Sequence, residues 1–407
     1  MLLLAAVSLI AIPAMVGASG ARPWGMIAAG QAIGAVAAVI VGFGWGLSGP
    51  AIIAKSAPGE RRREYVESAL ARMVLFVPAA LAAFAAAWIV GGDFAIYAGF
   101  GALSSASVGL TANWYFVGTD SPYMLLICET LPRVLGTLAG IAFMLLGSSA
   151  LVGVVWQLVG MLAAFLTSGV WILRTSKAIP RTEYPRRPML AVLRRQQNGV
   201  ISMGLSAVYA SAPILIVTAI IPASQPLYAV VEKVQRQINV GLNPFVTVLQ
   251  GWVPRAQPGF LRSRIRLCLS ICTAGSVLVI IVMFFGAPLL VGWLGNNQIH
   301  PPVHVYLLMA IVTGLSLFET ALSKACLAAV ERLGVVARAT ALSGIVGLAG
   351  VAVLAHFWGA GGALMGVMLG LFMRIVMELV GLKTALQDEG GDLSPSSRNQ
   401  RPLPKGR

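Results

Sequence analysis

The stretch LYAVVEKVQRQINVGLNPFVTVLQGWVP, Leu227–Pro254, joins a polar first half to an apolar second half. It is long enough for a helix to cross the hydrocarbon core of a bilayer, which takes about 20 residues. Four of its polar residues are spaced four, three and four apart, so a helix presents them on one face. They are Glu232, Arg236, Asn239 and Asn243. Because such groups are costly in lipid, this face indicates the wall of a hydrated cavity.

The composition of the whole chain excludes an ordinary soluble protein. Of its 407 residues, 58% are hydrophobic and only 11% are charged, which is too few to cover a water-exposed surface. Apolar runs of bilayer-spanning length recur from end to end. We therefore predict an all-α integral membrane protein with about 12 transmembrane helices. The expected spans are 1–18, 25–48, 73–91, 94–116, 123–147, 149–173, 201–221, 227–252, 267–293, 303–329, 337–355 and 361–383.

Positive charge alternates between the predicted loops. The chain has 29 Lys and Arg against 14 Asp and Glu, and the loops after odd-numbered spans hold only Arg22. The positive-inside rule then places both termini in the cytoplasm and the protein in the cell membrane, and nucleic acid is not needed to explain the charge. The cations on the cytoplasmic side are Lys55, Arg61, Arg62, Arg63, Arg72, Arg174, Lys177, Arg181, Arg186, Arg187, Arg194, Arg195, Arg255, Arg262, Arg264, Arg266, Arg332 and Arg338.

The longest connection divides the predicted spans six and six. We expect an N-terminal lobe at 1–174, a cytoplasmic linker at 175–200, a C-terminal lobe at 201–383 and a disordered cytoplasmic tail at 384–407. A shift of 204 residues aligns Trp24 with Tyr228 and Gln31 with Gln235, as a parallel pseudo-repeat about the membrane normal would require. Met1 opens directly into an apolar run without a basic leader, so we expect a retained helix and a native start upstream.

Cysteine and histidine give no metal or redox pattern. All four cysteines fall in or beside apolar runs, where small apolar packing is the expected role. The segment HPPVH offers His300 and His304 across a Pro-Pro turn without a neighbouring carboxylate, which is a weak pattern for a metal. We predict no metal, no cofactor and no catalytic residue, and no phosphate-binding GxxxxGK[ST] loop is present in the sequence.

Full charges lie at depth in four predicted spans. Each costs at least about 2.5 to 3.5 kcal/mol at the bilayer centre, so they should face the bundle interior. Two pairs with i,i+4 spacing, Glu129–Arg133 and Arg374–Glu378, allow a purely structural reading in which the partners neutralise each other. Lys324 lies near the cytoplasmic end and can snorkel to the interface. The charged residues at depth are Glu129, Arg133, Glu232, Lys233, Arg236, Glu319, Lys324, Arg374 and Glu378.

Cations and amides gather on the predicted helix at 227–252. Such a wall suits an anionic, hydrogen-bonding ligand such as a phosphate bearing sugars, and it does not suit a lipophilic cation. The amides that we expect to bind substrate are Gln235, Gln237, Asn239 and Asn243. The buried acids Glu129, Glu232 and Glu378 are candidates for coupling transport to protons or sodium.

Three stretches carry a resemblance to a known family: WGMIAAGQAIGAVAAVIVGFGWGLSGPAIIAKS (24–56), NWYFVGTDSPYMLLICETLPRVLG (113–136) and the stretch quoted at the outset. With these residues the chain resembles a Wzx-type polysaccharide flippase of the MATE/MOP transporter superfamily. The resemblance implies two six-helix bundles around a central cavity that work by alternating access. It also implies translocation of polyprenyl-pyrophosphate-linked oligosaccharides across the cytoplasmic membrane. The cations that fit substrate binding are Arg133, Lys233, Arg236 and Arg374.

The expected partners follow from the same resemblance. They are the lipid-linked glycan, membrane lipids, and the glycan polymerase and glycosyltransferases of the same pathway. A MATE-type multidrug or ion antiporter would share the fold but should have an acidic or aromatic cavity. A membrane-embedded sugar transferase would need paired carboxylates or a His on a sizeable loop. The longest outer loop, GNNQIHPPVH, has only about ten residues, and we therefore expect a transporter and not an enzyme.

Overall fold

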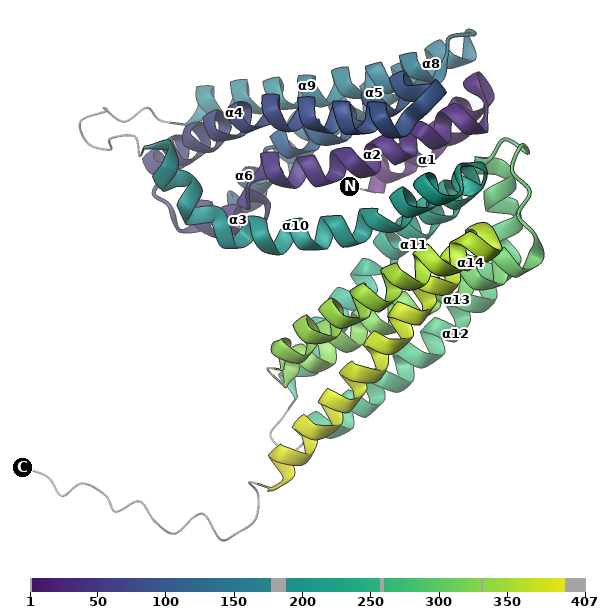
Figure 1. Cartoon of the computed structure of the whole chain (residues 1–407). Coiled ribbons are helices and arrows are strands. Elements are labelled where there is room, and N and C mark those ends of the chain that lie inside the picture. The colour runs from purple at the N-terminus through teal and green to yellow at the C-terminus, as the bar shows by residue number, and fades with distance from the viewer. Residues whose placement is uncertain (1, 177–187, 257–259, 331, 392–407) are drawn as a thin grey trace, which may run out of the picture. The chain divides into compact units, whose positions relative to one another are not determined.

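The protein is built from helices joined by short turns. The computed structural model describes residues 2–176, 188–256, 260–330 and 332–391, and within these ranges every regular element is helical (Figure 1). The all-α prediction is therefore confirmed. Large apolar side chains remain exposed on the helices, among them Ile89 at 82% and Leu145 at 78%, as side chains that contact lipid would be.

Seven helical segments of the described chain are long and apolar enough to cross a membrane. Two of them hold two predicted spans each, and the shorter apolar helices Leu3–Ser19 and Ala207–Ile220 match two further spans. The predicted span at 227–252 corresponds to α11 (Gln225–Trp252), whose polar residues set it apart from the seven. The chain is thus a multi-pass membrane protein. The seven segments are Ala21–Lys55, Pro58–Gly118, Pro122–Leu145, Ala150–Thr175, Leu261–Leu294, Val303–Leu327 and Gly334–Gln387.

The described chain forms two compact units. Unit 1 comprises Met1–Val234, Pro288–Pro302 and Trp358–Ala360, and unit 2 comprises the remainder. α11 contributes Gln225–Val234 to unit 1 and its later residues to unit 2. The lobe boundaries at 174 and 201 stay a prediction, as does the repeat.

Unit 1 is organised around α2 and α5, which pack along each other and against α4. Their shared core is rich in alanine, including Ala83, Ala98 and Ala102, so the helix backbones approach closely. The helices of unit 1 are α1 (Leu2–Ser19), α2 (Ala21–Gly42), α3 (Trp45–Lys55), α4 (Pro58–Gly91), α5 (Ala95–Ala106), α6 (Asn113–Gly118), α7 (Pro122–Met124), the π-helical η3 (Leu125–Thr130), α8 (Leu131–Leu145), α9 (Ala150–Thr175) and α10 (Met189–Ile220).

Unit 2 contains most of α12 (Leu261–Leu294), together with α13 (Val303–Ala321), the π-helical η6 (Leu322–Leu327) and α14 (Leu333–Gly391). Cys268, Cys272 and Cys326 lie in one buried apolar cluster of this unit, and Cys128 lies in a similar cluster of unit 1. The predicted packing role of the cysteines is confirmed. α14 is two helices joined at Trp358 and Gly359, where Gly359 takes a φ of 59°.

Several helix ends differ from the predictions on the side that we expect to be cytoplasmic. α10 begins at Met189 and α14 continues to Gly391, so helix extends into both the segment expected as a linker (175–200) and the segment expected as a tail (384–407). The physical reason is that a helix satisfies its own backbone and continues past the apolar residues on which a span is recognised. The assignment of these segments as linker and tail stays a prediction. Residues 177–187 of the linker and 392–407 of the tail lie outside the described residues.

The predicted loop at 49–72 is also mostly helix. α4 begins at Pro58, and the Ala57 N–H donates to Oε2 of Glu60 over 3.4 Å, which satisfies a backbone donor at the helix start. Arg61, Arg62 and Arg63 therefore lie in the first turns of a helix. Arg72, which we placed in the loop, is buried inside unit 1.

Candidate functional site

A buried arginine of α4 supports a break in the helical path of unit 1. Arg72 is only 1% exposed, and its Nη1 donates to the carbonyls of Leu110 and Thr111 over 3.1 and 2.6 Å. These carbonyls lie where the 3₁₀ segment η2 (Ser107–Leu110) ends and Thr111 turns extended. The guanidinium also lies 5.6 Å from the ring centroid of Trp114, within cation–π range. Backbone groups freed inside a membrane need such partners.

Glu129 satisfies the other side of the same break. Its Oε1 accepts a hydrogen bond of 3.0 Å from the N–H of Ala112, at the start of α6. The side chain is 1% exposed and projects from η3, where a π-helical turn precedes Pro132. Arg72 and Glu129 thus stabilise a non-helical connection that is buried within unit 1. This gives Glu129 a structural task, and its role in ion coupling stays a prediction.

Arg133 lies one turn beyond Glu129, in the first turn of α8, and is half-buried. Its carbonyl accepts a hydrogen bond from Thr137 Oγ1 over 2.9 Å. Unit 1 therefore contains two guanidinium groups near this connection, Arg72 on α4 and Arg133 on α8, which continues from the η3 segment that carries Glu129. A role for Arg133 in substrate binding stays a prediction.

The polar face of α11 begins in unit 1. Lys233 Nζ donates to Oε1 of Gln31 on α2 over 2.8 Å. Eight residues earlier on α11, the buried Gln225 side chain donates to the carbonyl of Gly25, which also lies on α2. These two contacts fix the start of α11 along α2. Glu232, beside Lys233, is half-buried.

The same face continues in unit 2. Gln235 Nε2 donates to the carbonyl of Met309 on α13 over 3.2 Å. Gln237 and Asn239 are half-buried, whereas Arg236 and Asn243 are exposed. α11 therefore carries half-buried and exposed cations and amides along one helix, and its role as the wall of a hydrated cavity stays a prediction.

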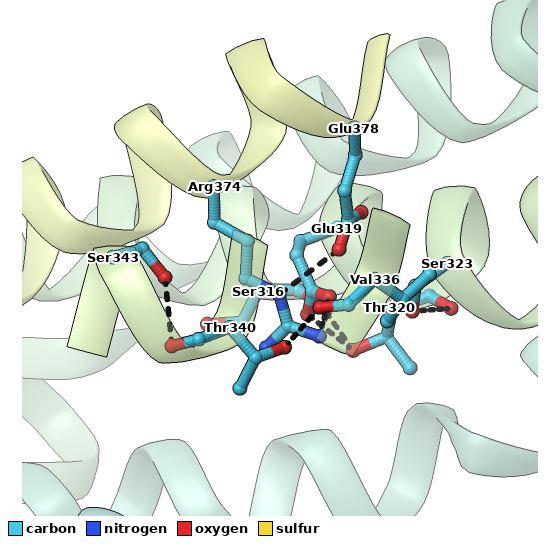
Figure 2. A network of polar contacts seen from close by, with 9 residues as sticks. All are labelled: Ser316, Glu319, Thr320, Ser323, Val336, Thr340, Ser343, Arg374 and Glu378. Atoms are coloured by element: carbon cyan, nitrogen blue, oxygen red, sulfur yellow. Dashed lines mark hydrogen bonds and ion pairs between the residues drawn. The ribbon is translucent and has the colours of Figure 1, made fainter. Parts of the chain in front are cut away.

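Unit 2 contains an ionic cluster, in which one arginine joins two carboxylates (Figure 2). Arg374 Nη2 lies 2.6 Å from Oε1 of Glu319, and Arg374 Nε donates to Oε1 of Glu378 over 3.0 Å. Glu378 is fully buried and Glu319 is 6% exposed. Thr320 Oγ1 lies 3.5 Å from Glu319 Oε2 and donates to the Ser316 carbonyl over 2.7 Å. With all three groups ionised, the cluster carries one net negative charge.

The structure brings together part of what the sequence suggests. The i,i+4 pair Arg374–Glu378 forms, and Lys324 is exposed, as a snorkelling lysine would be. Glu319 joins that pair from α13, although it was not among the candidate site residues. Gln31 and Arg72 were missed as well. A polar side chain within or beside an apolar run could have drawn attention to each of these residues. The sequence could not name their partners, because the partners lie on other helices or segments.

Comparison with known proteins shows the fold. A solved structure titled an inward-facing conformation of a multidrug resistance MATE family transporter of the MOP superfamily matches with a TM-score of 0.70 and 15% identity, over 96% of both chains. The chain has the fold of a MATE family transporter. At this level of identity the likeness concerns the MATE fold alone.

Two further solved structures are more distant. A eukaryotic MATE transporter matches with a TM-score of 0.49 and 14% identity over 96% of this chain and 94% of its own. An outward-facing multidrug resistance MATE family transporter matches at 0.41 and 12%, over 97% and 96%. No protein-family model and no curated protein matches the sequence.

Proposed function

We propose that this protein is a flippase that translocates polyprenyl-pyrophosphate-linked oligosaccharides across the cytoplasmic membrane by alternating access, for polysaccharide biosynthesis. The MATE fold supports transport as the general activity. The observation that carries the narrower proposal is the polar face of α11. The face combines Lys233 and Arg236 with the amides of Gln235, Gln237, Asn239 and Asn243.

The chemistry of this face fits a pyrophosphate with sugars. Guanidinium and ammonium groups bind phosphate oxygens through charge-assisted hydrogen bonds, and amides bind hydroxyl groups with either of their two polar atoms. Lys233 is already oriented by Gln31 over 2.8 Å, so little side-chain freedom remains to be lost when a ligand binds. Arg133 is a further candidate cation, from unit 1.

Ion coupling is assigned to the cluster in unit 2. Arg374 is engaged by two carboxylates, so its charge is less available to a substrate than the sequence suggested. The net negative charge of Glu319, Arg374 and Glu378 attracts one proton or one sodium ion. Binding or release of that cation would change how strongly Arg374 of α14 pairs with Glu319 of α13. Glu232 and Glu129 remain secondary candidates for coupling.

Complementation of a flippase-deficient strain tests the proposal. Arg236→Ala should abolish glycan export, because losing one partner of a charged contact costs roughly 2 to 5 kcal/mol of binding. Arg236→Lys should restore only part of the export, because a point charge replaces the bidentate fork. The matched control is Arg338→Ala, an exposed arginine in the first turns of α14.

Protein level in the membrane is checked by immunoblot for each variant. Full export by the Lys233→Ala, Arg236→Ala double variant, at normal protein level, would show that the face of α11 does not bind the glycan.

A MATE-type multidrug or ion antiporter is the second candidate. The specific observation in its favour is the carboxylate excess around Arg374, which suits a cationic substrate as well as a coupling ion. Drug resistance conferred on a sensitised strain, lost in Glu319→Gln and unaffected by Arg236→Ala, would favour the antiporter over the flippase.

A further inference from the structure

A pocket of about 360 Å³ opens between α12 and the last turns of α14, within unit 2. Its lining residues come from one face of each helix. On α12 they are spaced four and three apart, and on α14 three, one and three apart, with Gln387 following. The lining residues are Arg262, Arg266, Leu269, Leu379, Leu382, Lys383, Leu386 and Gln387.

The rim of the pocket is strongly cationic. Arg262, Arg266 and Lys383 are all exposed, and no carboxylate is among the lining residues. The side chains of Asp388 and Glu389 lie outside those that the structure describes. Arg262 and Arg266 sit in the first turns of α12, where the helix dipole already favours an anion and no acidic residue occupies the first turn. The two arginines at the start of α12 and Lys383 near the end of α14 therefore have no carboxylate among the described lining residues of the pocket.

The floor of the pocket is apolar. Leu269, Leu379, Leu382 and Leu386 supply it, and Leu382 is 3% exposed. Arg262 donates to the carbonyl of Leu386, which ties the cationic rim to the floor. A free phosphate would fit the rim but would leave the leucines unused. A phospholipid fits both, because its headgroup is anionic and its acyl chains are apolar.

We propose that this pocket binds an anionic phospholipid, with the headgroup phosphate held by Arg262, Arg266 and Lys383 and an acyl chain lying on the leucines. The predicted topology places both helix ends at the cytoplasmic surface, where basic pockets between helices meet anionic headgroups. This site is separate from the polar face of α11 and does not depend on the substrate of the transporter.

Native mass spectrometry of the full chain, purified in detergent and supplied with phosphatidylglycerol or phosphatidylethanolamine, tests the proposal. In the mass spectra, wild type should retain phosphatidylglycerol in preference to phosphatidylethanolamine. In thermal unfolding, its melting temperature should be several degrees higher with phosphatidylglycerol than without it. The Arg262→Gln, Arg266→Gln, Lys383→Gln variant should lose at least about five-fold of the retained phosphatidylglycerol. The matched control removes three exposed cations elsewhere, Lys55→Gln, Arg174→Gln and Arg338→Gln, and should behave as wild type.

A further variant controls for misfolding, and a further ligand tests whether the acyl chains are needed. Leu379→Glu places one carboxylate in the pocket and should also reduce the retained phosphatidylglycerol. This variant replaces the triple variant in the test if the triple variant does not fold. Glycerol 3-phosphate, which has the headgroup chemistry without acyl chains, should neither stabilise wild type nor displace the lipid. Equal retention by the triple variant and the control, equal retention of the two lipids, or stabilisation by glycerol 3-phosphate would each overturn the proposal.

Discussion

At the scale of single residues, Arg72 shows how a charge can stabilise a membrane protein from inside. Arg72→Met keeps most of the side-chain volume but removes the donors to the Leu110 and Thr111 carbonyls. Each carbonyl left without a partner costs about 1 to 3 kcal/mol, so the variant should melt well below wild type in detergent.

Arg62 offers a matched comparison. Its Nη1 also donates to two carbonyls, those of Leu173 and Ser176, over 2.8 and 3.0 Å. The contact with Leu173 is exposed to solvent, and the contact with Ser176 is only partly buried. Arg62→Met should therefore lower the melting temperature much less, because water replaces the lost donor. Equal losses in the two variants would contradict the role given to burial at Arg72.

At the scale of elements, the approach of α2 to α5 depends on glycine. A Cβ added at Gly30 would overlap the carbonyl oxygen of Ala98, which is backbone and cannot rotate away. Gly30→Ala should destabilise unit 1 by about 1 to 3 kcal/mol through overpacking. Thermal unfolding followed by fluorescence-detected size-exclusion chromatography measures the effect.

Gly251 in α11 is the control for that substitution. A Cβ there meets no described atom within 4 Å. Gly251→Ala should leave stability unchanged or raise it by about 0.5 to 1 kcal/mol, because alanine loses less entropy than glycine in a helix. The same Gly→Ala substitution should therefore lower stability at Gly30 and should not lower it at Gly251. A loss at Gly251 equal to that at Gly30 would show that helix–helix distance does not decide the outcome.

At the scale of the whole molecule, the distribution of cations predicts the orientation in the membrane. Single cysteines at Gln298, in the turn between α12 and α13, and at Arg174, in the last turn of α9, report on the two predicted sides. In intact cells an impermeant maleimide should label Gln298→Cys, and it should label Arg174→Cys only after permeabilisation. The background has the four native cysteines replaced, and labelling of both sites from outside would refute the orientation.

The sequence by itself determined the class of the protein and the character of one helix. Composition and the length of the apolar runs established a multi-pass helical membrane protein. The spacing of polar residues predicted the face of α11, and the i,i+4 spacing predicted the pair Arg374–Glu378. These features are local, because helix periodicity and hydrophobic length are properties of consecutive residues.

Only the tertiary structure decided which charges meet across helices. It showed that Glu319 of α13 shares Arg374 with Glu378, that Lys233 contacts Gln31 of α2, and that Arg72 is buried beside a helix break rather than exposed in a loop. Such contacts depend on how distant helices pack, and periodicity within one helix contains no information about the helix beside it. For the same reason the cationic pocket between α12 and α14 becomes visible only when the two helix faces are placed together.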